Sequence, residues 1–118
     1  MGTWGAGNFQ NDQSLDWLWS DVQKPLIEKL NSETAKHDES SGEEIMAAVE
    51  VLAVLCEQLN ADPPKPLEVT AWRDAYLRAW ESYIDASDPK PGYKEERRAV
   101  IVNTFERLLK TARKGHER

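Results

Sequence analysis

The amino-acid sequence predicts an all-α fold, an irregular bundle of four to five helices in a single domain, residues 1–118. Apolar residues recur every three or four positions along most of the chain, which is the spacing of one buried helix face. No stretch alternates between apolar and polar residues as a half-buried strand would. Polar or proline-rich breaks separate the periodic stretches, as turns between packed helices do.

The first eleven residues carry three of the six glycines together with Trp4 and Phe9. Glycine permits backbone conformations that other residues avoid. We therefore expect a coil that packs across one end of the bundle and buries both aromatic rings. Asn11 or Asp12 should end this coil by capping the first helix.

The first helix has apolar residues on two sides. Its main stripe, which we expect to be buried, consists of Leu15, Leu18, Trp19 and Val22. Pro25 should kink or restart the helix, because proline lacks an amide hydrogen and crowds the preceding turn. Trp17 falls about opposite the stripe. We expect the N-terminal coil to cover it, and an exposed Trp17 would instead resemble the aromatic anchor of a binding surface.

The next helix should lie at the centre of the bundle. Residues 31–42 form a polar loop, and near its end Ser41 has the spacing of a capping box with Glu44. The buried stripe that follows consists of Ile45, Val49, Leu52, Cys56 and Leu59.

Two further helices complete the predicted bundle. A proline-rich turn at residues 62–66 precedes a helix over residues 67–84, and a turn at residues 87–92 precedes a helix over residues 93–114. The apolar face of the former consists of Val69, Trp72, Tyr76, Trp80 and Tyr83. That of the latter consists of Ile101, Phe105, Leu108 and Ala112.

The net charge of −6 is unevenly distributed. Residues 1–64 hold 3 Lys or Arg against 12 Asp or Glu, whereas residues 65–118 hold 12 against 9. The two halves can attract each other, or the acidic half can meet a protein partner with a basic surface. An acidic total argues against non-specific nucleic-acid binding.

The sequence gives no indication of membrane insertion or secretion. Its longest apolar stretch, residues 45–55, is too short to span a bilayer, and no signal peptide is recognisable. Cys56 is the only cysteine, so no disulfide can form within the chain. We therefore expect a cytoplasmic protein.

The opening residues resemble those of a known family. The segment MGTWGAGNFQND, followed by Asp16-Trp17-Leu18, is similar to the start of a family of small bacterial proteins classed only as a domain of unknown function. The alanine-rich stretch at residues 47–53 and the pair Ala71-Trp72 also resemble later blocks of that family. The resemblance implies an all-α domain, and it implies no activity, cofactor or catalytic residue.

No set of residues indicates catalysis, and we expect no metal or cofactor. His37 falls in the polar loop and His116 in the tail, both toward solvent, so that Cys56 in the core has no histidine at metal-binding spacing. Asp12 and Asp16 share a helix face, but two carboxylates are too few to specify a hard cation.

Two acid–base arrangements remain open. Glu43, Glu50 and Glu57 recur every seven residues, which favours a solvated acidic stripe on the central helix. Alternatively, Glu50 is buried in an ion pair with Arg73. The last helix is basic, and we expect its charges to be solvated or paired within the chain.

We therefore carry two functional hypotheses. The first is a non-catalytic protein-interaction module, an inhibitor of the antitoxin or immunity type. The alternative is a domain that binds a small molecule or anion, with an enzymatic role open, in a pocket lined by tryptophans that include Trp80. The candidate binding residues are Trp4, Asp12, Asp16, Trp17, Glu50, Trp72 and Arg73.

Overall fold

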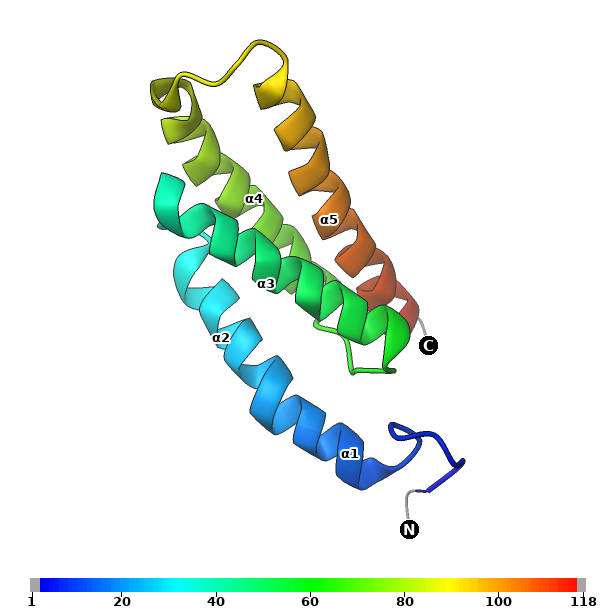
Figure 1. Cartoon of the computed structure of the whole chain (residues 1–118). Helices are drawn as coiled ribbons and strands as arrows, with labels where there is room; N and C mark the ends of the chain where they lie inside the picture. The colour runs from blue at the N-terminus through cyan, green and yellow to red at the C-terminus, as the bar shows by residue number, and fades with distance from the viewer. Residues whose placement is uncertain (1–2, 117–118) are drawn as a thin grey trace.

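A computed structural model describes residues 3–116, and within them the regular structure is helical. The elements are α1 (Asp12–Trp17), the π-helical turn η1 (Leu18–Gln23), α2 (Lys24–Glu33), α3 (Glu39–Gln58), α4 (Pro66–Tyr83), the 3₁₀ turn η2 (Ile84–Ser87) and α5 (Tyr93–His116). The run from α1 to α2 is unbroken, so the chain forms four helical rods (Figure 1). The predicted all-α fold is confirmed. Met1 and Gly2 of the opening motif lie outside the described residues, as does Arg118.

The first rod passes through Pro25 without ending. It begins after Asn11, whose side chain accepts a hydrogen bond from the Ser14 amide at 2.8 Å, so the predicted cap is confirmed. Proline has no amide hydrogen to donate and its ring crowds the carbonyl four residues earlier. The π turn immediately before α2 is wider than an α-helical turn and places Pro25 in the first turn of α2.

α3 is the central helix, as predicted, and packs against α2, α4 and α5 (Figure 1). It begins earlier than expected, because its capping box is formed by Asp38 and Ser41 rather than by Ser41 and Glu44. The Asp38 carboxylate accepts hydrogen bonds from the amides of Ser40 and Ser41, each at 3.0 Å. These bonds and those from the two serine hydroxyls lower the pKa of Asp38 to about 2.

The predicted faces of α3, α4 and α5 meet in one hydrophobic core. Ile45, Val49, Leu52, Tyr76 and Phe105 are each 0% exposed. Two hydrogen bonds from the α4 aromatics fix neighbouring helices: Trp72 Nε1 donates to Asn31 Oδ1 at 2.9 Å, and Tyr76 Oη donates to the Gly42 carbonyl at 3.0 Å. Buried donors of this kind have to be satisfied, so they specify how α4 is oriented.

The N-terminal segment projects from the bundle instead of packing over its end (Figure 1). The molecule measures 55 × 23 × 23 Å, and its radius of gyration of 15.9 Å exceeds the roughly 13.5 Å of a compact domain of this length. We call residues 3–23, which comprise the coil, α1 and η1, the N-terminal arm. α1 contributes no buried residue.

The predicted burial of Trp4 and Trp19 is wrong, because they are 51% and 43% exposed. Phe9 is half-buried. The coil closes on itself: the Trp4 amide donates to the Gln10 carbonyl at 3.0 Å, and the Gly7 amide donates to Gln10 Oε1 at 2.7 Å. Its backbone is thus satisfied locally, and no contact with the bundle is needed to hold it.

We predict that truncating the core and truncating the arm have different effects on stability. Phe105→Ala should lower the free energy of unfolding by about 3–5 kcal/mol, since a large buried ring leaves a cavity. Trp4→Ala should change it by less than about 0.5 kcal/mol, as expected for an exposed site. Urea denaturation measures both values. A loss of several kcal/mol in Trp4→Ala would show that the coil does pack against the bundle.

Candidate functional site

The N-terminal arm presents three tryptophans to solvent. Trp17 is 52% exposed, in addition to Trp4 and Trp19, so the expectation that the coil covers Trp17 is wrong. Asp12, Asp16 and Asp21 are also exposed on the arm, which contains no Lys or Arg. The arm therefore combines large aromatic surfaces with negative charge only.

The C-terminal part of the arm contains two buried residues, and one of them, Gln23, bonds to the bundle. Leu18 and Gln23 are 2% and 1% exposed. Gln23 Nε2 donates to the Asp62 carbonyl in the α3–α4 loop at 2.8 Å. The arm is therefore held from its C-terminal part, while α1 and the coil extend beyond that attachment.

A hollow of about 270 Å³ lies between the arm and the α3–α4 loop. Its lining consists of Leu15, Asp16, Trp19, Gln23, Asn60 and Asp62. The two carboxylates and the indole favour a cationic group, because both a carboxylate and an aromatic face attract positive charge.

The predicted tryptophan pocket does not form. Trp72 and Trp80 are 4% and 2% exposed and belong to the hydrophobic core, whereas Trp4 and Trp17 lie on the exposed arm. The apolar face of α4 supplies the centre of the bundle, so its tryptophans are used for packing.

The proposed Glu50–Arg73 pair does not form either. Arg73 binds Glu106 at 3.2 Å and Asp74 at 3.1 Å. Glu50 is exposed, and its nearest cation is Arg107 at 3.9 Å. α4 presents Arg73 to α5, not to α3.

The acidic stripe on α3 is exposed as predicted, and arginines of α5 pair with it. Glu43 binds Arg97 at 3.2 Å, and Glu57 binds Arg107 at 2.8 Å. The hydrogen bond from Arg107 lowers the pKa of Glu57. Exposed pairs of this type each contribute about 0–1 kcal/mol, so they align the two helices more than they stabilise them.

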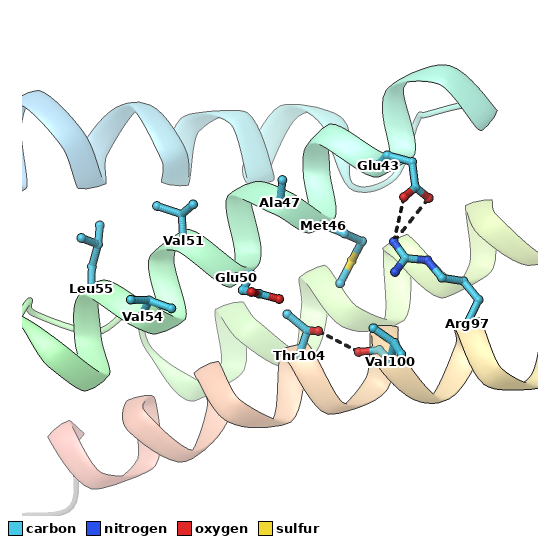
Figure 2. Close-up of a pocket in the computed structure, with 10 residues that line it drawn as sticks. All are labelled: Glu43, Met46, Ala47, Glu50, Val51, Val54, Leu55, Arg97, Val100 and Thr104. Atoms are coloured by element: carbon cyan, nitrogen blue, oxygen red, sulfur yellow. Dashed lines mark hydrogen bonds and ion pairs between the residues drawn. The ribbon is translucent and has the colours of Figure 1, made fainter.

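An apolar groove of about 490 Å³ runs between α3 and α5 (Figure 2). Its apolar lining includes Met46, Val51, Val54, Leu55 and Val100, and the Glu43–Arg97 pair lies at one end. The Thr104 hydroxyl donates to the Val100 carbonyl at 2.7 Å and has no free role as a nucleophile. The groove therefore offers apolar surface rather than reacting groups. The signal in the sequence was that Val51 and Val54 of α3 are apolar but fall outside its predicted buried stripe.

His37 lies in a cluster at the α2–α3 joint, not toward solvent as predicted. Its ring stacks on Tyr76 with centroids 4.3 Å apart, and its Nδ1 lies 3.0 Å from Tyr83 Oη. Its Nε2 is buried with no hydrogen-bond partner among the described residues. Burial lowers the pKa of His37, because the charged ring would lose hydration there.

Gly42 makes this cluster possible. A Cβ at this position would lie 2.5 Å from Tyr83 Oη and 3.2 Å from Tyr76 Oη. Both tyrosines can therefore approach α3 only where a side chain is missing.

The described residues contain no group of three His, Cys, Asp or Glu placed to hold a metal ion. Burial raises the pKa of the Cys56 thiol to about 11, so it stays protonated at neutral pH. None of the helices from residue 3 to residue 116 combines the length and apolar character needed to cross a bilayer.

Residues 2–117 match the family model of a domain of unknown function, DUF4259, and the chain belongs to that family. The resemblance found in the sequence is thus confirmed at the level of the family. No curated protein and no solved structure matches the chain.

We predict that Gly42→Ala destabilises the protein by about 1–3 kcal/mol, because the added methyl group overpacks the cluster. At an ordinary position in a helix interior, the same substitution would stabilise the protein. In a Tyr83→Phe background the same substitution should cost less, because the colliding hydroxyl is gone. A double-mutant cycle by urea denaturation measures this coupling. Tyr93→Phe is the control, and equal coupling for both tyrosines would refute the collision.

We predict that His37 makes stability depend on pH. Its pKa in the folded protein lies below the ordinary value of 6.5, so the unfolded chain binds a proton more readily. The free energy of unfolding should therefore fall as the pH drops below about 6.5. His37→Phe should remove that slope between pH 7.5 and 5, and His116→Gln should retain it. A slope that survives His37→Phe would assign it to other groups.

Proposed function

We propose that this protein is a non-catalytic interaction module and that the N-terminal arm is its contact surface. The observation that carries the proposal is the exposure of Trp4, Trp17 and Trp19 on a segment with little contact to the core. Tryptophan is the residue most enriched at the energetic centres of protein interfaces.

The charges of the arm support a partner with a basic surface. The exposed carboxylates of Asp12, Asp16 and Asp21 lie on the same arm as the indoles, a combination that resembles an aromatic centre with a charged rim. Such a rim speeds the encounter with a basic surface and disfavours an acidic one.

Within this class, we propose an inhibitor of the antitoxin or immunity type that acts in the cytoplasm. A small acidic domain with exposed indoles can cover a basic surface of another protein without any chemistry of its own. The apolar α3–α5 groove is a second surface on which such a partner can extend its contact.

We predict that a photo-crosslinking amino acid at position 17, introduced in living cells, captures the partner. Tyr93, which is 44% exposed, is the matched control position, because its exposure is similar to that of Trp17. Mass spectrometry then identifies the product specific to position 17. Absence of any product beyond that of the control would refute the proposed contact surface.

Once the partner is identified, Trp17→Ala should weaken the binding of this protein to it at least about thirtyfold, as truncation of an interface hot spot does. The free energy of unfolding should remain within about 0.5 kcal/mol of the wild type. A Trp17→Ala variant that binds normally would exclude this residue as an anchor.

A further inference from the structure

The C-terminal end of α5 lies toward the same end of the molecule as the arm (Figure 1) and carries the positive charge that the arm lacks. We call Lys110, Arg113 and Lys114 the basic end. All three are exposed, and none of them has an ion-pair partner within residues 3–116. Arg97 and Arg107 of the same helix, by contrast, form ion pairs with carboxylates of α3.

A hollow of about 440 Å³ opens at this end of the molecule, between α5 and the end of α3. Its lining is mixed: apolar contributions come from Cys56, Ala61 and Pro63, and positive charge comes from Arg107, Lys110 and Lys114. The Glu57 carboxylate also lines the hollow and is paired with Arg107 at 2.8 Å. The Cys56 thiol is protonated and acts as an apolar group. This surface suits an aromatic ring that is accompanied by carboxylates, because an indole packs on the apolar part and attracts the ammonium groups.

We propose that two copies of this chain associate, with the N-terminal arm of each copy packed into the basic hollow of the other. The inference rests on the arm being a contact surface and names the occupant as a second copy. Trp17 and its neighbouring indoles would supply the aromatic contact, and Asp16 and Asp21 would pair with Lys110 and Lys114.

The positions of the two surfaces suit a symmetric pair. Asn60 of the α3–α4 loop lines both the hollow beneath the arm and the basic hollow, so the two surfaces flank one residue. Two-fold association requires that both members of a complementary pair lie on the same face of the chain, because each contact is made twice. In Figure 1 the arm and the C-terminal end of α5 lie toward the same end of the molecule.

The energetics of the arm also favour this arrangement. α1 is the first part of a rod that continues through η1 and α2, but none of its six residues is buried, so it gains little stability from packing on the bundle. Half-exposed indoles that become covered would remove on the order of 300 Å² per copy from water. That area, together with the facing hollow, is a substantial part of the about 800 Å² per partner of a stable interface.

Sedimentation of the purified full-length chain at low ionic strength tests the proposal. At about 100 µM, a hundredfold above a micromolar Kd, the wild type should sediment as a dimer. Raising the salt concentration should dissociate it, because exposed charges are screened. A wild type that remains a monomer overturns the proposal.

Charge reversal locates the contact. Asp16→Lys with Asp21→Lys should be monomeric, and so should Lys110→Glu with Lys114→Glu, while an equimolar mixture of the two variants should recover a dimer. Lys36→Glu with Lys90→Glu makes the same charge change as Lys110→Glu with Lys114→Glu, in loops away from both surfaces, and should remain dimeric. A dimer that survives both reversals, or a mixture that stays monomeric, overturns the proposal.

The outcomes separate this proposal from the proposed function. A monomeric wild type whose position 17 crosslinks to a different protein overturns self-association and leaves the interaction module standing. A dimer that requires Trp17 supports both. The absence of any product specific to position 17, with a monomeric wild type, overturns both.

Discussion

The absence of a side chain at Gly42 is the constraint on which the packing of the bundle depends. Tyr76 and Tyr83 of α4 reach the first turns of α3 at this position, and Tyr76 donates its hydroxyl hydrogen to the Gly42 carbonyl. Tyr76 also stacks on His37 from the α2–α3 loop and packs on Phe105 of α5, with centroids 6.0 Å apart. The α2–α3 loop, α3, α4 and α5 thus meet where the two tyrosines contact Gly42. The geometry of this contact sets where α3 lies relative to α4.

The bundle and the arm are stabilised by different means. The bundle derives its stability from a core in which many residues are less than 2% exposed. The arm relies on local hydrogen bonds in its coil and on the attachment at Leu18 and Gln23. Segments with few buried contacts open at low free-energy cost, and binding surfaces are commonly found among them. The arm can therefore vary its contacts without unfolding the bundle.

Helical periodicity predicted α3, α4, α5 and the core between them because the apolar stripes of these three helices pack on one another. Most residues of the predicted faces of α3, α4 and α5, including Trp72 and Phe105, are buried. Cys56, Leu59 and Tyr83, at the edges of these faces, are half-buried. The same reasoning failed for Trp19, since periodicity shows which residues share a face but not whether another segment covers that face. The burial of Trp4 was predicted from the glycines beside it, which permit the coil to fold back but do not make it pack on the bundle. The Glu50–Arg73 pairing failed for a related reason: the rotation of α4 about its axis, which turns Arg73 toward Glu106, is fixed by core packing.

In the structure, the unevenly distributed charges of the sequence divide into groups that pair within the bundle and groups that do not. Part of the charge is neutralised between α3 and α5, where Glu43 and Glu57 meet Arg97 and Arg107. The acids of the arm and the basic end of α5 take no part in that pairing within the described residues. The arm and the basic end of α5 are oppositely charged surfaces of one chain. Each lies next to apolar groups that the core does not cover, and these features favour association. The residues unused by folding are therefore the ones to which we assign the function.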